Sequence, residues 1–237
     1  MNCGQLVVVH HGCDITLRDD LVSGRIAHLT HSKNKYDWLG SGAYFFENDF
    51  ERAMLFAQNS HENPAKRYTA VPIATPAVVG AVLRVSNWLD MTTQSGVGEY
   101  LDALGPMLMG FEEAGTAAPR NHAVSEDDKD VIVRELDRSV FDFIHQARQS
   151  QPQLPDFQAV RGVFKQGKPL SGHSGFQENT HIQIALRENS CVQGWFLPPG
   201  LELLTDQQLK EARARLLQLK SAGKPRVRAK SVINPPG

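Results

Sequence analysis

The segment Gly40-Ser41-Gly42-Ala43-Tyr44-Phe45-Phe46 constrains the fold of this chain more than any other stretch of its sequence. Two glycines, two residues apart, allow a tight turn. The apolar residues that follow are too few for a helix, so the segment predicts a turn that leads into a short strand. Tyr44 would stand on this strand, where its ring could stack on a planar heterocycle while its hydroxyl stays in water. A core tyrosine behind a hairpin turn is the alternative interpretation.

The chain opens with a run of β-branched residues, and residues 5–10 therefore predict a buried strand that ends at His11 and Gly12. Successive side chains of a strand face opposite ways, so only one of His10 and His11 can face a given cleft. Gly12 would let a ligand approach the backbone, whose N–H and C=O can both bond an amide. The same strand ending is also compatible with a purely structural role.

A third polar segment lies late in the chain. Residues 181–186 predict a strand whose polar face carries His181 and Gln183, with isoleucines on the other face. Histidine and glutamine on the polar face, in place of lysine or glutamate, favour a cleft over open solvent. The Gly-rich stretch of residues 165–175 comes just before this strand and predicts a loop of about a dozen residues, a length that is typical of functional loops.

The other elements follow from capping patterns and hydrophobic periodicity. Asp14 predicts the cap of a short helix that stops at Gly24. Asn48 and Glu51 have capping-box spacing in front of a helix with one apolar face. The further predicted elements are strands at residues 78–86, 157–163 and 191–196 and helices at residues 125–148 and 203–219, whereas residues 91–120 show no clear pattern. Scattered strands and separate helices favour an α+β fold over a regularly alternating one.

Composition narrows the class of protein. The 237 residues suffice for one substantial domain, and 41% hydrophobic and 22% charged residues are typical of a globular protein. No apolar run reaches the roughly 18 residues of a membrane helix and the start lacks a signal-peptide pattern, so we expect a cytoplasmic protein without a membrane contact. A net charge of −1 gives no global attraction to nucleic acid. Cys3, Cys13 and Cys191 show no CxxC spacing, so the sequence predicts neither a disulfide framework nor a metal site.

The order of these segments resembles the motifs of the diphtheria-toxin and PARP branch of ADP-ribosyltransferases, in particular its small bacterial toxin or phage-defence members. Residues 9–12 are similar to the first motif of that branch, with His11 at the histidine position. Residues 39–46 are similar to the second motif, with Tyr44 at the tyrosine position. Phe56, on the helix that follows, falls near the second aromatic residue of the family.

The third motif departs from the family pattern. In PARP-type enzymes a glutamate begins the third strand, whereas here Glu178 comes two or three residues early and the strand carries His181 and Gln183. Some members of the wider clan use other polar residues at this place, so the third catalytic group is one of Glu178, His181 and Gln183. A carboxylate would bond the nicotinamide ribose and favour the developing positive charge, and a neutral side chain would stabilise that charge less.

The resemblance implies a fold and a division of the chain. The expected fold is α+β, an ADP-ribosyltransferase-like split β-sheet core with flanking helices, in a catalytic domain at residues 1–200 with an insert at about residues 91–150. Residues 201–237 would form a C-terminal amphipathic helix and a basic tail.

The resemblance also implies roles for the site residues, with NAD⁺ as the co-substrate and no metal. The Gly12 backbone would hold the nicotinamide carboxamide. Tyr44 and Phe56 would sandwich the nicotinamide ring, and His11 would bond the adenosine ribose. Catalysis would then be mainly a matter of positioning and electrostatics, because the glycosidic bond breaks through an oxocarbenium-like state.

The implied activity is transfer of ADP-ribose to a macromolecular acceptor, a protein or a nucleic acid, which the loop at residues 165–175 would select. An antitoxin is the implied partner, and the helix at residues 203–219 either docks on the domain or binds such a partner. An NAD⁺ glycohydrolase of the same fold and a non-catalytic module that binds NAD⁺ or ADP-ribose are the alternatives. An RNA 2′-phosphotransferase would need phosphate-binding basic residues that the sequence does not identify. The basic tail fits a nucleic-acid contact or a solvated chain end equally well; its cations are Lys220, Lys224, Arg226, Arg228 and Lys230.

Overall fold

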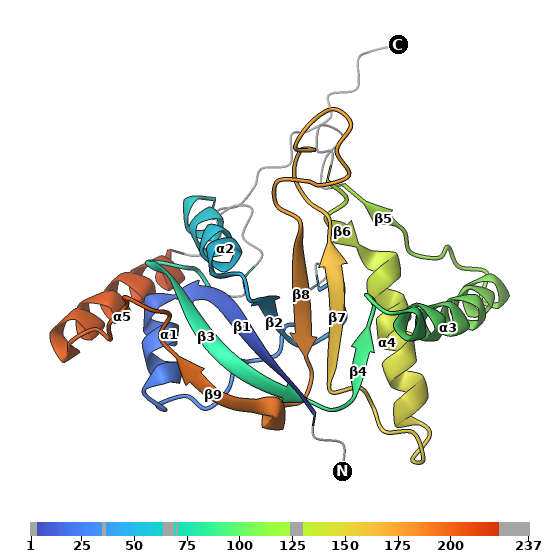
Figure 1. Cartoon of the computed structure of the whole chain (residues 1–237), viewed down its shortest axis with the longest axis horizontal. Helices are drawn as coiled ribbons and strands as arrows, with labels where there is room; N and C mark the ends of the chain where they lie inside the picture. The colour runs from blue at the N-terminus through green and yellow to red at the C-terminus, as the bar shows by residue number, and fades with distance from the viewer. Residues whose placement is uncertain (1–3, 35–36, 64–68, 70, 124–129, 223–237) are drawn as a thin grey trace.

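A seven-stranded mixed sheet with helices on both sides forms the body of the protein (Figure 1). The computed structural model describes residues 4–34, 37–63, 69, 71–123 and 130–222. The strand order is β4-β7-β8-β2-β1-β3-β9, and only the β4–β7 pair is parallel. The strands are β1 (Gln5–Asp14), β2 (Ala43–Glu47), β3 (Pro76–Val85), β4 (Trp88–Asp90), β7 (Ala159–Phe164), β8 (His181–Leu186) and β9 (Val192–Phe196). The predicted α+β class is confirmed.

Strand β1 is longer than predicted. It does not end at His11 and Gly12 but stays paired with β3 as far as Asp14, with Gly12 opposite Val78. Gly12 serves the packing of helix α2 (Phe50–Glu62), because a Cβ atom at this position would lie 2.1 Å from the carbonyl oxygen of Ala53. The glycine at which the strand was predicted to end therefore allows a helix to lie directly on the strand.

The predicted cap at Asp14 is confirmed and does more than cap helix α1 (Ile15–Val22). Its Oδ1 accepts hydrogen bonds from the backbone N–H and the hydroxyl of Thr16, at 3.0 and 2.7 Å. Its Oδ2 accepts from the backbone N–H groups of Ala74 and Thr75, at 2.8 and 3.0 Å. One buried carboxylate therefore joins the start of α1 to the chain that enters β3.

We expect Asp14→Ala to lower the free energy of unfolding by about 3 kcal/mol, because it leaves several buried donors without an acceptor. Urea denaturation followed by circular dichroism measures the loss. Asp102→Ala is the matched control, since Asp102 is exposed on helix α3 (Gln94–Glu113). Equal stability of the two variants would contradict the assigned role of Asp14.

The N-cap of helix α2 lies one residue later than predicted. Asp49, not Asn48, accepts the hydrogen bond from the Arg52 N–H, at 2.8 Å. Asn48 has a φ of +46°, a left-handed conformation that asparagine tolerates better than most residues. The chain turns there between β2 and α2, which leaves Asp49 in the capping position.

Helices α3 and α4 (Glu135–Gln149) cover one face of the sheet and share a core cluster with β7 and β8. Helices α3 and α4, which lie in the region expected to be an insert at about residues 91–150, are thus packed against the sheet. The predicted helix at residues 125–148 is too long, because Val133–Arg134 is a strand, β6, that pairs with β5 (Asn121–His122). Residues 125–129 of that prediction lie outside the described residues. Helix α3 was missed in the sequence, since four glycines and Pro106 interrupt its periodicity.

Two further cores lie on the other parts of the sheet. The larger one joins α1 to strands β1, β2, β3 and β8; its buried members include Val9, Leu21, Phe45, Leu83, Ile184 and Leu186. A small one, formed by Phe46, Ala53 and Val78, lies under α2. Cys13 and Cys191 are buried free thiols, and Cys3 lies outside the described residues.

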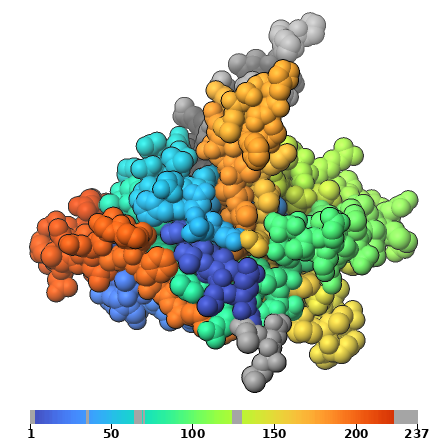
Figure 2. Space-filling view, viewed as in Figure 1, coloured from blue at the N-terminus to red at the C-terminus, as the bar shows by residue number. Residues whose placement is uncertain are grey.

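The predicted loop before β8 is folded as a hairpin that extends β7 and β8 beyond the sheet. Backbone N–H groups of Leu170, Glu178 and Asn179 donate to carbonyls of the facing chain. Figure 2 shows this segment, in orange, projecting from the body. Its apolar side chains at Leu170 and Phe176 are exposed, which is typical of a surface that meets another molecule.

Helix α5 (Asp206–Ser221) docks on α1 (Figure 1). The Leu204 N–H donates to Asp19 at 2.8 Å, and Arg213 pairs with Asp20 at 2.7 Å. The basic tail beyond residue 222 lies outside the described residues. Within the described ranges, no helix is long and apolar enough to span a bilayer.

Candidate functional site

His11 lies where β1 and β2 separate. The two strands are paired only at Val9 with Glu47 and at His10 with Phe46. Beyond that point the His11 Nδ1 atom lies 2.8 Å from the carbonyl oxygen of Tyr44, and it must carry the proton because a carbonyl only accepts. Burial lowers the pKa of His11, so the ring is neutral at pH 7. The His11 ring therefore contacts the backbone of Tyr44, whereas the Tyr44 side chain packs elsewhere.

The peptide groups of Gly12 point towards the same separation. The Val8 carbonyl accepts from Asn48 N–H on the β2 side, whereas the Ile15 N–H donates to Thr75 on the β3 side. Peptide groups alternate in direction along a strand, so those of Gly12 share the side of Val8 and face β2 past its last paired residue. Their direction suits an amide ligand, although the glycine itself lies buried under α2.

Tyr44 does not place its hydroxyl in water, which corrects our expectation. The hydroxyl donates to the Gly40 carbonyl at 2.8 Å and accepts from the Leu39 N–H at 3.0 Å. Burial raises its pKa well above the usual value. The ring packs in the core of α3 and α4, while Phe56 packs beside Phe46 in the small core under α2, with ring centroids 6.0 Å apart. The structure therefore does not place Phe56 against Tyr44.

Of the three candidates for the third position, Gln183 is the one linked, through Trp38, to the turn that binds the Tyr44 hydroxyl. It lies opposite Phe46 in the β2–β8 pairing, and its Oε1 accepts a 2.6 Å hydrogen bond from the Trp38 indole N–H. Trp38 precedes Leu39, the residue that donates to the Tyr44 hydroxyl. Trp38 was not predicted as a site residue, although its place beside the Gly-x-Gly segment was a usable signal.

Glu178 lies apart from this cluster. It is exposed on the hairpin, and its Oε2 lies 3.4 Å from the Lys168 N–H. The hairpin backbone holds Glu178 ahead of the first residue of β8, so the structure does not bring this carboxylate to His11 and Tyr44.

His181 is buried between two aromatic rings and is only 5% exposed. Its ring lies 5.0 Å from that of Phe46 and stacks on Phe164 at 5.5 Å. Nδ1 lies 2.6 Å from the Asn179 carbonyl and therefore carries the proton, which leaves Nε2 as a buried atom without a hydrogen-bond partner. Burial, together with the positive charge of Arg52 and Arg134, lowers the pKa of His181 to about 4.

The lowered pKa of His181 predicts a loss of stability in mild acid. Below the usual pKa of 6.5 the unfolded ring takes up a proton, but the folded ring stays neutral until about pH 4, so stability falls as the pH drops through this interval. The effect is on the order of 3 kcal/mol at pH 4. Urea denaturation between pH 7.5 and 4.5 measures it. His181→Gln should flatten the slope, and the exposed His173→Gln should leave it unchanged; equal slopes in all three proteins would refute the assignment.

Two arginines that form no ion pair within the described residues flank His181. The guanidinium of Arg52 lies 5.2 Å from the Phe46 ring, and that of Arg134 lies 4.0 Å from Phe164 and 4.6 Å from Trp38. Among the described residues, no carboxylate lies within ion-pair distance of either one. The Nε of Arg52 is also buried without an acceptor. This row of cations and rings is suited to an anionic ligand.

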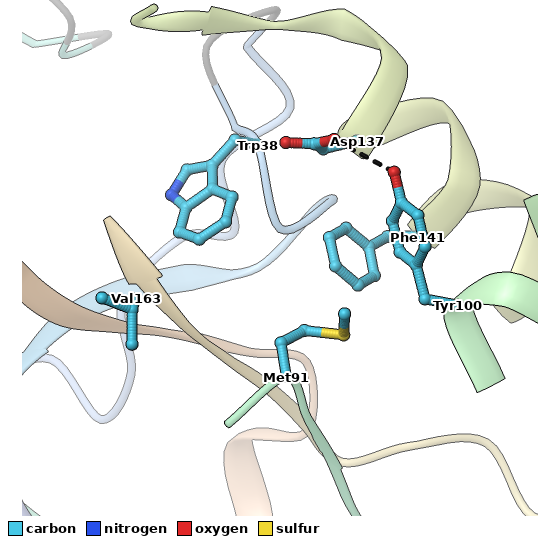
Figure 3. A pocket seen from close by; sticks show the side chains of 6 residues that line it. All are labelled: Trp38, Met91, Tyr100, Asp137, Phe141 and Val163. Atoms are coloured by element: carbon cyan, nitrogen blue, oxygen red, sulfur yellow. Dashed lines mark hydrogen bonds between the residues drawn. The ribbon is translucent and has the colours of Figure 1, made fainter. Parts of the chain in front are cut away.

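A cavity of about 320 Å³ lies on another side of Trp38 (Figure 3). Its wall is formed by Trp38, Met91, Tyr100, Asp137, Phe141 and Val163. A second hollow, of about 400 Å³, lies over β3 and β9 and includes Leu6, Arg84 and Trp195. Neither of the two is lined by His11, Gly12 or Phe56.

No family model, no curated protein and no solved structure matches the chain. Within the described part of the chain, no group of three or more His, Cys, Asp or Glu side chains is arranged to hold a metal ion. The function is therefore inferred from the residues and geometry of the site.

Proposed function

We propose that this protein is an NAD⁺-consuming ADP-ribosyltransferase with a split-sheet core of that family's type. The observation that carries the proposal is a chain of hydrogen bonds across the neighbouring strands β1, β2 and β8. It runs from the His11 ring to the Tyr44 backbone carbonyl, from the Tyr44 hydroxyl to the turn at Leu39 and Gly40, and from the Trp38 indole in that turn to Gln183. These contacts link the three segments that resemble the family's motifs and so support the proposal.

The nicotinamide end of NAD⁺ would bind where β1 and β2 separate. Gly12 offers an N–H and a C=O that point towards β2, the pair of groups that a carboxamide needs. His11, neutral and held by Tyr44, keeps Nε2 free to accept a bond from a ribose hydroxyl. Phe56 would cover the ring from α2, and Tyr44 would support the pocket through its strand and turn.

Gln183 is the third group in this proposal. Its Oε1 is occupied by Trp38, so its amide N–H₂ remains to donate to a hydroxyl of the nicotinamide ribose. As the C1′–N bond breaks, its electron pair leaves with nicotinamide and a positive charge develops on the ribose. A neutral amide positions the ribose but stabilises this cation less than a carboxylate would.

Arg52 and Arg134 support a dinucleotide substrate. NAD⁺ carries a diphosphate, and these guanidiniums are the unneutralised cations beside Gln183 and His181. His181, unprotonated at pH 7, offers Nε2 as an acceptor for the proton that the attacking nucleophile loses. The same pair of arginines would also bind the phosphate of a 2′-phosphorylated RNA, which keeps the phosphotransferase alternative open to test.

The acceptor would be a macromolecule, a protein or a nucleic acid, that meets the hairpin at Leu170 and Phe176. Glu178 lies on this hairpin and would face the acceptor. The setting we propose, a toxin or phage-defence effector in the cytoplasm with an antitoxin partner, depends on the family resemblance alone.

Incubation of the purified protein with a cell lysate and NAD⁺, labelled in the adenylate phosphate, tests the proposal. We expect release of nicotinamide and a labelled macromolecule that either protease or nuclease removes. Nicotinamide without a labelled macromolecule would select the glycohydrolase. If neither free nicotinamide nor a labelled macromolecule forms but the protein binds NAD⁺, the protein is a non-catalytic binding module. If the protein also does not bind NAD⁺, the proposal is wrong.

A further inference from the structure

The cavity beside Trp38 combines aromatic walls with a carboxylate. Figure 3 shows Asp137, on α4, and Tyr100, on α3, meeting at one side of the cavity, with Trp38 and Phe141 on its wall. The Tyr100 hydroxyl donates to Asp137 Oδ1 at 3.0 Å, which fixes the carboxylate, and no described residue forms a hydrogen bond or ion pair with Oδ2. Met91 completes the apolar lining.

The charges around this cavity favour a cation. Among the described residues, no basic group lies within 4.0 Å of the Asp137 carboxylate. Arg134 offsets part of its charge from a greater distance. Helix α3 contains four acidic residues and no basic one, and of the four only Glu99 has an ion pair, with Arg148. The acidic residues of α3 are Glu99, Asp102, Glu112 and Glu113.

We propose that this cavity binds a cationic side chain, a guanidinium or an ammonium, of a protein partner. Cations bind favourably over aromatic faces, and a planar guanidinium can in addition make two hydrogen bonds to one carboxylate. The Trp38 ring already lies against one guanidinium of the chain, since that of Arg134 is 4.6 Å from its centroid. The cavity volume of about 320 Å³ accommodates such a side chain.

The place of the cavity suggests what the bound side chain is for. Trp38 forms part of its wall and donates its N–H to Gln183, so the cavity and the proposed catalytic group share one indole. A protein held by a basic side chain here would be anchored beside the reacting ribose. This purpose rests on the proposed transferase function, whereas binding itself is measured without NAD⁺.

Calorimetric titration with short capped peptides tests the binding. The peptides are Gly-Arg-Gly, Gly-Lys-Gly and Gly-citrulline-Gly; citrulline keeps the shape of arginine without its charge. We expect the arginine peptide to bind at least about tenfold more tightly than the citrulline peptide, with the lysine peptide between them. Equal affinity for the arginine and citrulline peptides would overturn the proposal.

Variants locate the site. Asp137→Asn should weaken binding of the arginine peptide at least about tenfold, whereas Asp102→Asn, which removes the same charge from the exposed side of α3, should leave it unchanged. Similar weakening in both would mean attraction to the acidic surface alone and would overturn the site.

If Asp137→Asn does not fold, the NMR resonance of the Trp38 indole N–H in the wild-type protein tests the site instead. We expect this resonance to shift when the arginine peptide is added. A resonance that does not shift would refute the site. Displacement of the peptide by a single-stranded oligonucleotide would point to a polynucleotide partner and contradict the proposal. If the protein binds the arginine peptide but does not cleave NAD⁺, the proposed cation site stands and the proposed transferase function is wrong.

Discussion

Gln183→Ala is expected to lower the rate of nicotinamide release at least about 100-fold while the protein remains folded. The amide of Gln183 is the group we assign to the nicotinamide ribose, and loss of one such polar contact in a transition state typically costs about 3 kcal/mol or more. Its removal creates no large cavity, because the side chain is half-buried and its side-chain hydrogen bond within the described residues is to Trp38. Steady-state assays with purified protein measure the change.

Two further variants separate catalysis from structure. Gln193→Ala removes the same side chain from β9, where it lines the hollow over β3, and should leave the rate unchanged. Gln183→Glu should retain activity or exceed the wild type, since a carboxylate favours the positive charge on the ribose. If Gln183→Ala kept the full rate, or if Gln193→Ala lost as much, Gln183 would not be the third group.

Gly12→Ala is expected to reduce the free energy of unfolding by more than about 3 kcal/mol. A Cβ atom there would lie 2.1 Å from the Ala53 carbonyl oxygen and 3.3 Å from the Ala57 nitrogen, so helix α2 must move away from β1. Backbone atoms of a packed helix cannot yield as a flexible side chain would. Urea denaturation with purified variants measures the loss.

The matched control for this glycine is Gly98→Ala. Gly98 lies on α3, and a Cβ atom there has nothing within 4 Å, so alanine should raise stability by up to about 1 kcal/mol. A Gly12→Ala protein as stable as the wild type would show that α2 does not rest on β1 in solution.

The sequence predicted the elements whose signals are local. Asp14 was recognised as a cap, residues 181–186 were recognised as a strand with its correct bounds, and the short strand that carries Tyr44 was also recognised, although the turn before it lies at residues 37–40, slightly earlier than the two glycines indicated. Capping, alternation and turn chemistry each involve a few neighbouring residues, so one chain segment suffices to identify them.

Features that depend on distant segments were missed or misread. Gly12 was interpreted as the end of the strand and a point where a ligand approaches the backbone, whereas it is helix α2 that lies against it. The polar partner of Gln183 is Trp38, 145 positions away. Arg134 was assigned to a helix interior, but the short β6 strand places it over Trp38 and Phe164. None of these contacts leaves a periodic trace in the sequence.

The candidate site was predicted in part. His11 contacts the Tyr44 backbone but not its side chain, and among the three candidates for the third group Gln183 is the one linked through Trp38 to the turn that binds the Tyr44 hydroxyl. The sequence could not separate Gln183 from Glu178, because the answer depends on where β8 begins to pair with β2 and how the hairpin carries Glu178 away.

The most direct test of the central claim is a crystal structure of the Gln183→Ala variant with NAD⁺, in which slow turnover preserves the substrate. The account predicts the nicotinamide between β1 and β2, with its carboxamide within hydrogen-bond distance of the Gly12 N–H and C=O, and the diphosphate near Arg52 and Arg134. Nicotinamide bound instead in the cavity beside Trp38, or crystals that take up no NAD⁺ at millimolar concentration, would contradict it.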